Sequence, residues 1–122
     1  ASPFVADFVG KVNVVPGRVR DGVLEAGTLR LPGDGSDREV RVYLRPEDVL
    51  ARPIADGDDH VFDSVIDKIE FLGSYCHVHV STSALAPHKL TVYLSLNYLA
   101  EAQLQVGSGL RLRVLPERIK VF

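Results

Sequence analysis

The sequence contains no methionine, no tryptophan and a single cysteine, Cys76. One cysteine cannot form an internal disulfide, which excludes a disulfide-stabilised scaffold and fits a reducing compartment. The sequence has no run of about 18 apolar residues, so it predicts no bilayer-spanning helix. Translation starts with methionine, whereas this sequence begins with Ala1. We therefore expect it to be an excised part of a longer protein.

The motifs with which common enzymes bind nucleotides or activate nucleophiles are also absent. A P-loop needs a glycine, four residues and then Gly-Lys-Ser/Thr. The only Gly-Lys pair, Gly10–Lys11, has Val5 at the required glycine position and is followed by Val12. No dinucleotide fingerprint, Gly-x-Ser-x-Gly elbow or Cys-x-x-Cys pair occurs. We predict that these residues have no catalytic activity and hold no cofactor.

Charge of either sign is not in excess. The 122 residues include 14 Lys and Arg against 16 Asp and Glu, which gives a net charge of −2. Such a balance provides no overall attraction to nucleic acid or to an anionic membrane. The 46% of hydrophobic residues is enough for an ordinary core, and the length predicts one compact unit or two very small barrels.

Alternation of apolar and polar residues predicts many short strands. The clearest case is 40–45, where valine and leucine alternate with arginine and tyrosine. Further strands are expected at 12–20, 23–25, 29–31, 61–72, 75–80, 90–94, 110–115 and 119–122. Helical spacing predicts a short N-terminal helical segment over 1–10 and one helical turn within 98–104. This pattern indicates an all-β barrel or sandwich.

One segment is echoed later in the chain. Residues 40–49 and 110–119 are both alternating strands that end at Pro-Glu, with an apolar residue two positions after the glutamate. Proline ends the strand because it lacks an N–H. The echo predicts two similar β-units, roughly 11–54 and 60–122, separated by the acidic loop at 55–59.

Two residue patterns allow chemistry, and each has a plainer interpretation. His77 and His79 share one face of a predicted strand and could bind a metal ion, although no third ligand is placed; otherwise they face solvent while Cys76 lies in the core. Tyr43, Tyr75 and the arginines on outer faces could bind an oligonucleotide, as could Tyr93. The alternative is an ordinary polar surface, and we expect no nucleic acid.

Four stretches together resemble a known family. They are Phe4-Val5-Ala6-Asp7-Phe8-Val9-Gly10 with Asn13 and Pro16-Gly17-Arg18-Val19, then Leu44-Arg45-Pro46-Glu47-Asp48-Val49, Ile69-Glu70-Phe71-Leu72-Gly73-Ser74, and Leu115-Pro116-Glu117-Arg118-Ile119. In this order they resemble the TOBE regulatory region that follows the ATPase domain in ATP-binding subunits of ABC importers. The resemblance covers nearly the whole chain.

The resemblance implies an OB-like barrel in which strands from the first and last parts of the region pack together. Residues 1–10 would be the connection from a missing ATPase domain, which would hold ATP and magnesium, and 11–122 the TOBE-like domain. The implied function is regulation and dimerisation, coupling solute or partner sensing to transport. The implied partners are the ATPase domain, a second copy and the transmembrane permease subunits. The implied location is cytoplasmic, peripheral at the inner face of the cell membrane.

Some members of this family bind oxyanions through a Ser-x-Arg-Asn stretch. The matching positions here are Gly10, Lys11, Val12 and Asn13, so only the asparagine is kept. Lys11, Asn13 and Ser74 are candidate contacts for a small anion. Alternatively, the Asn13 side chain forms a hydrogen bond with the local backbone. The free-standing oligonucleotide-binding module and the small metal-binding β-protein stay open as alternative functions.

Overall fold

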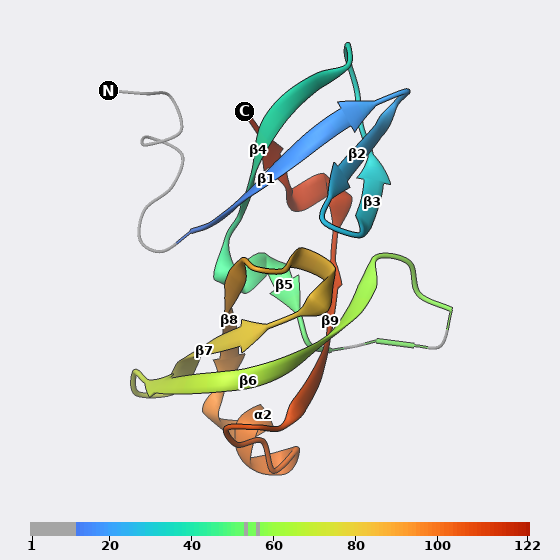
Figure 1. Cartoon of the computed structure of the whole chain (residues 1–122). Helices are drawn as coiled ribbons and strands as arrows, with labels where there is room; N and C mark the ends of the chain where they lie inside the picture. Colours follow the sequence, from blue (N-terminus) through green and yellow to red (C-terminus); the bar gives the residue numbers. More distant parts are fainter. Residues whose placement is uncertain (1–11, 53, 56) are drawn as a thin grey trace.

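The computed structural model describes residues 12–52, 54–55 and 57–122, which form two five-stranded antiparallel sheets. The first sheet has the order β10-β4-β1-β2-β3, and the second the order β5-β9-β6-β7-β8. The strands are β1 (Asn13–Arg20), β2 (Val23–Ala26), β3 (Leu29–Pro32), β4 (Arg38–Leu44), β5 (Val49–Leu50), β6 (Val61–Phe71), β7 (Tyr75–Ser81), β8 (Lys89–Ser95), β9 (Gly109–Val114) and β10 (Lys120–Val121). Each sheet curls into a barrel-like OB arrangement, and the two lie one above the other (Figure 1). The all-β, OB-like prediction is confirmed.

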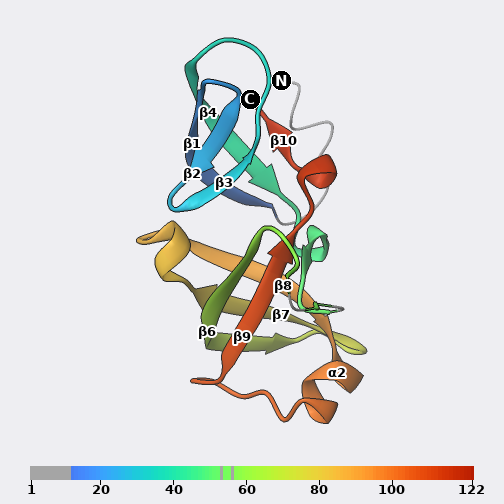
Figure 2. The ribbon, with the colours of Figure 1, turned by 90° about the vertical axis from the view of Figure 1, so that its right-hand side faces the viewer.

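Each sheet receives one strand from the other half of the chain. β5, which directly follows the first four strands, pairs with β9, while β10 at the C-terminal end pairs with β4. Figure 2 shows β9 in the second sheet continuing through a short turn to β10 beside β4. The predicted units 11–54 and 60–122 stay a prediction, but their strands are exchanged between the sheets.

The two crossovers are the two halves of the sequence echo. Each is a 3-10 turn that begins with proline: η1 (Pro46–Asp48) and η3 (Pro116–Arg118). Arg118 Nη1 donates to Asp48 Oδ1 over 3.2 Å, and the Asp48 side chain is only 12% exposed. The repeated Pro-Glu motif therefore makes the two connections between the barrels, and an ion pair joins them.

Strand alternation decides which side chains form the core. In β7 and β8 every second residue is buried, and Cys76 is one of them. Cys76 is a fully buried core residue, and this burial raises the pKa of its thiol. The largest fully buried side chains come from both sheets: Val15, Val19, Val42, Val49, Ile66, Val78, Val80, Leu90, Val92, Leu112 and Val114.

Pro16 lies inside β1, where a proline normally interrupts pairing. Its partner across the ladder is Arg41, whose N–H and carbonyl are used instead by Phe122, at 2.7 and 2.9 Å. The pair is one of the non-hydrogen-bonded pairs of an antiparallel ladder, so the missing N–H breaks no bond to β4. β1 therefore continues through Pro16 and stays paired with β4 on both sides of it.

Helix is scarce among the described residues. The turn predicted within 98–104 is α2 (Leu96–Glu101), which begins two residues earlier because the Ser95 hydroxyl accepts the Tyr98 N–H at 3.1 Å. The helical segment predicted for 1–10 lies outside the described residues. None of the helices formed by the described part of the chain is long and apolar enough to cross a bilayer.

A β-bulge between Ile66 and Lys68 turns Asp67 out of the ladder towards Ser81 and Lys89. The Ser81 hydroxyl donates to the Asp67 carboxylate, and Lys89 Nζ lies 3.5 Å from it. The hydrogen bond from Ser81, followed by the charge of Lys89, lowers the pKa of Asp67. A carboxyl with a lowered pKa adds stability above its ordinary pKa, and this contribution is lost as the pH falls through the lowered value.

We expect Ser81→Ala to raise the pKa of Asp67 back towards its ordinary 3.8, because the largest stabilising contact of the carboxylate is lost. The pKa can be measured by NMR titration of the Asp67 carboxyl carbon. Lys89→Met, which removes the weaker contact, is the control and should cause a smaller rise. A larger rise for Lys89→Met than for Ser81→Ala would contradict the order of the two causes.

Candidate functional site

The Asn13 side chain joins the two barrels. Its Nδ2 donates to the Thr91 carbonyl at 2.8 Å, and its Oδ1 accepts the Thr91 N–H at 2.7 Å. Asn13 begins β1, and Thr91 lies in the middle of β8, which is an edge strand of the second sheet. The Asn13 side-chain amide therefore forms the two hydrogen bonds with the edge of β8 that the backbone of a further strand would form there. The Asn13 side chain does bind backbone, but the expectation that this backbone is local was wrong, because Thr91 is 78 residues away in the sequence.

The network continues from Thr91 to the outer face of the second sheet. Thr91 Oγ1 lies 3.2 Å from His79 Nδ1, and His79 Nε2 contacts the Glu70 carboxylate. The His79 side chain is 23% exposed and that of Glu70 37%. A chain of hydrogen bonds thus runs from a surface carboxylate to the amide that joins the barrels.

A second contact between the barrels involves Thr28, which donates to the Ala84 carbonyl from its backbone N–H and, at 3.4 Å, from its side-chain hydroxyl. The Thr28 N–H, in the turn between β2 and β3, donates to the Ala84 carbonyl at 2.7 Å. Ala84 lies in the 3-10 turn η2 (Ser83–Leu85), which connects β7 and β8. Gly27 beside it has φ +59°, and a Cβ there would lie 2.0 Å from the Ala84 oxygen. Only glycine fits this contact.

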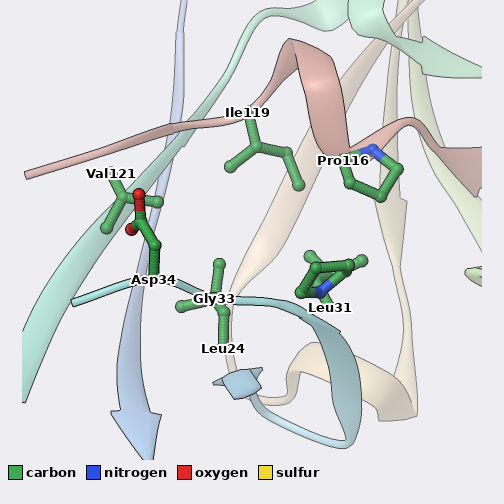
Figure 3. Close-up of a pocket in the computed structure, with 8 residues that line it drawn as sticks. Leu24, Leu31, Gly33, Asp34, Pro116, Ile119 and Val121 are labelled. Atoms are coloured by element: carbon green, nitrogen blue, oxygen red, sulfur yellow. The ribbon is translucent and has the colours of Figure 1, made fainter. Parts of the chain in front are cut away.

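The first barrel does not close between its two edge strands, β3 and β10. A cavity of 300 Å³ lies at this seam, between the end of β3 and the segment that contains η3 and β10. Figure 3 shows Ile119 and Val121 on one side of it, facing Leu24 and Asp34 on the other. Asp34 is the one charged residue of this lining, and Arg38 Nη1 donates to the Asp34 carbonyl at 2.9 Å.

Of the candidate anion contacts, the two that the structure describes, Asn13 and Ser74, are not brought together. Ser74 lies in the turn between β6 and β7, and its carbonyl accepts the Leu96 N–H at 3.0 Å. Leu96 is five residues beyond Thr91, the partner of Asn13, which corresponds to roughly 17 Å at the rise of a strand. Lys11 lies outside the described residues. An anion site at these positions stays a prediction.

His77 and His79 do share one face of β7, as predicted, but they have different partners. His77 lies edge-on to Tyr75 and Tyr93, with ring centroids 5.9 and 5.7 Å away, whereas His79 contacts Glu70. Within the part of the chain that the structure describes, no three His, Cys, Asp or Glu side chains are placed to hold a metal ion.

The tyrosines on which an oligonucleotide site would depend are not equally accessible. Tyr43 is 3% exposed, because the C-terminal Phe122 packs edge-on against it at 5.0 Å. The expectation that Tyr43 is a surface residue was therefore wrong: β10 brings Phe122 over it. Tyr75 and Tyr93 lie on the outer face and stack on one another at 4.2 Å.

Comparison with known protein families shows to which family this chain belongs. The sequence profile of the TOBE domain matches residues 42–122, which span β4 to β10. The chain belongs to the TOBE domain family. The match includes three of the four stretches on which the resemblance was based, the last being 115–119. TOBE domains are non-catalytic parts of importer ATP-binding subunits.

Relatives of this TOBE domain extend the match to the whole chain. The Fe(3+) ions import ATP-binding protein FbpC 2 of Rhizobium meliloti is 27% identical over 98% of the chain. The sulfate/thiosulfate import ATP-binding protein CysA of Bacillus cereus is 32% identical over 100% of it. The chain spans about a third of these relatives, since it covers 34% of each.

A solved structure confirms the fold of this TOBE domain. The cytoplasmic molybdate-binding protein ModG, crystallised with molybdate bound, matches with a TM-score of 0.67 at 14% identity. The match covers 89% of this chain and 94% of ModG. At 14% sequence identity, the similarity to ModG is evidence for the fold alone.

The sequence did not predict which residues of the second barrel bind Asn13 and Thr28 of the first barrel in this TOBE domain. Thr91 and Ala84 carry no motif, because each contributes only backbone groups to the contact. The one usable signal was Gly27-Thr28, a two-residue turn between short strands. That signal predicts a hairpin, but it does not reveal that the turn touches η2 of the other barrel.

Proposed function

We propose that this chain is the regulatory and dimerisation domain of the ATP-binding subunit of an ABC importer, and that it couples solute or partner sensing to ATP-driven transport. The family match over residues 42–122 carries the proposal. The two relatives support it, because both are import ATP-binding proteins and both are about three times as long as this chain. ATP and magnesium would bind in the part of the parent outside these residues.

The way in which the barrels are joined supports a role in transmitting a signal. Two crossovers, the Asn13–Thr91 pair and the Thr28–Ala84 bond connect them. A ligand that binds one barrel more tightly in one arrangement of the pair would favour that arrangement of both barrels. Regulation would follow from a different affinity for two arrangements of the parent dimer.

The partners proposed for the parent are a second copy of itself and the transmembrane permease subunits. The parent would lie in the cytoplasm at the inner face of the membrane. Regulatory ligands within reach of this proposal include a small oxyanion, in view of the molybdate bound to ModG and the sulfate/thiosulfate import named for the Bacillus cereus relative.

The experiment that tests the proposal compares the full parent transporter in proteoliposomes with a version that lacks residues 12–122. We expect the shortened transporter to hydrolyse ATP but to lose the response of that hydrolysis to solute accumulated in the vesicles. The matched control is a full-length Leu112→Ala variant, which weakens the core of the second barrel. An unchanged response in the shortened transporter would refute the proposal.

A further inference from the structure

Two tyrosines form a platform on the outer face of the second sheet. The rings of Tyr75 and Tyr93 stack with centroids 4.2 Å apart and an angle of 11° between their planes, and His77 lies edge-on to both. Cys76 and Leu94 beside them are buried, so strand alternation turns the tyrosines outward. Tyr93 is 39% exposed. We call Tyr75, His77 and Tyr93 the tyrosine platform.

A carboxylate lies at the edge of this platform. Glu47, in η1, lines a cavity of 170 Å³ together with Tyr93 and Ser95. Desolvation, a hydrogen bond with Tyr75 and the negative charge of Glu47 raise the pKa of Tyr93. Among the ion pairs of the described residues, none includes Glu47. The platform therefore offers electron-rich rings beside an exposed negative charge.

Elsewhere in the lining of the same cavity, a tyrosine and a nearby glutamate already bind an arginine of this chain. The guanidinium of Arg52 lies 4.3 Å from the centre of the Tyr98 ring, and its Nη1 is 3.5 Å from the Glu101 carboxylate. Both Arg52 and Tyr98 line the cavity that Glu47 and Tyr93 line. Arg52 and Tyr98 in the lining thus form an arginine–tyrosine–glutamate group with Glu101, which lies outside the lining, whereas Tyr93 and Glu47 supply a tyrosine and a glutamate without an arginine.

We propose that the tyrosine platform and Glu47 bind an arginine side chain of a partner protein. A guanidinium can lie flat on an exposed tyrosine ring and donate two parallel hydrogen bonds to a carboxylate. A nucleic acid strand would stack on the rings as well, but Glu47 would repel its phosphates. The proposal rests on the partner sensing of the proposed function. Its test uses this chain alone, so the result is independent of any transport assay.

The test is an NMR titration of the isotope-labelled 122-residue chain with the peptide acetyl-Gly-Arg-Gly-amide. The same peptide with citrulline in place of arginine has nearly the same shape and no charge. We expect the arginine peptide to shift the amide signals of Tyr93, Leu94 and Ser95, and the citrulline peptide to cause at most weak shifts. The affinity should fall as salt is added, because the Glu47 carboxylate is exposed.

Glu47→Gln and Tyr93→Leu should each weaken binding by about fivefold, the effect of losing one exposed charge or ring. The matched control is Glu117→Gln, since Glu117 follows Pro116 in η3 as Glu47 follows Pro46 in η1, and it should bind the peptide as the unmodified chain does. Equal binding of citrulline, shifts confined to other surfaces, or equal loss in the control would overturn the proposal. Salt-dependent binding of a single-stranded oligonucleotide at the platform would also overturn it, as would self-association that Tyr93→Leu abolishes.

Discussion

Gly27→Ala is expected to destabilise the chain by about 3 kcal/mol or more, from two causes. The first is the left-handed backbone at φ +59°, which costs a residue with a Cβ about 1 kcal/mol. The second is steric, because the new Cβ would lie 2.0 Å from the Ala84 oxygen. A backbone atom cannot rotate away as a side chain can. The two barrels must therefore separate locally, which breaks the Thr28–Ala84 hydrogen bond and leaves a buried carbonyl without its donor.

Gly22→Ala is the matched control for this effect. Gly22 has φ +77° in the turn between β1 and β2, and a Cβ there would meet nothing within 4 Å. It should show the conformational cost of about 1 kcal/mol and no more. Urea denaturation followed by circular dichroism gives the unfolding free energy of each variant. Equal losses in the two variants would mean that the Gly27–Ala84 contact does not hold the barrels together.

Asn13→Ala is expected to cost about 2–3 kcal/mol, because both hydrogen bonds to Thr91 are lost at a largely buried position. Without the amide, the N–H and carbonyl of Thr91 in edge strand β8 lose their partners. An unpaired strand edge also invites pairing with another chain. We therefore expect increased self-association, measurable by sedimentation, along with the loss of stability.

Asn13→Asp provides a sharper test, because it keeps the shape of the side chain and changes only the donor. At pH 7 an oxygen of the introduced carboxylate would face the Thr91 carbonyl oxygen, and both are acceptors. Asn13→Asp should therefore be at least as destabilising as Asn13→Ala. Its pKa in the folded chain should be raised, and the stability should then recover as the pH falls through that raised value, once a proton is present to donate. A stability gap between this variant and the unmodified chain that stays constant with pH would contradict the assignment. Asn97→Ala, on the exposed surface of α2, is the control and should be nearly neutral.

Local pattern was sufficient for most of the strands. The alternation in 40–45 reflects a half-buried strand, because successive side chains of a strand point to opposite faces. It predicted β4, and the similar pattern at 61–72 predicted β6, which spans Val61–Phe71. The two-residue β5 was not predicted, since its existence depends on pairing with β9, more than sixty positions later in the chain.

The outcome for Tyr43 shows where local pattern ceases to be informative. Alternation correctly places Tyr43 on the opposite face of the strand from Val42 and Leu44. It does not tell whether that face is open to solvent. Phe122 covers that face because β10 crosses into the first sheet, and the sequence around Tyr43 contains no trace of this.

By itself, the sequence determined most of the strands, the turns between them, the Pro-Glu stops and the family resemblance, since each depends on residues close together in the chain. Tertiary structure alone decided which strand enters which sheet, that Asn13 completes the edge of β8, and that Tyr93 and Glu47 line one cavity. The physical reason is that hydrogen-bonding groups of the backbone are the same at every residue. Their long-range partners are selected only when the two sheets bury their apolar faces together.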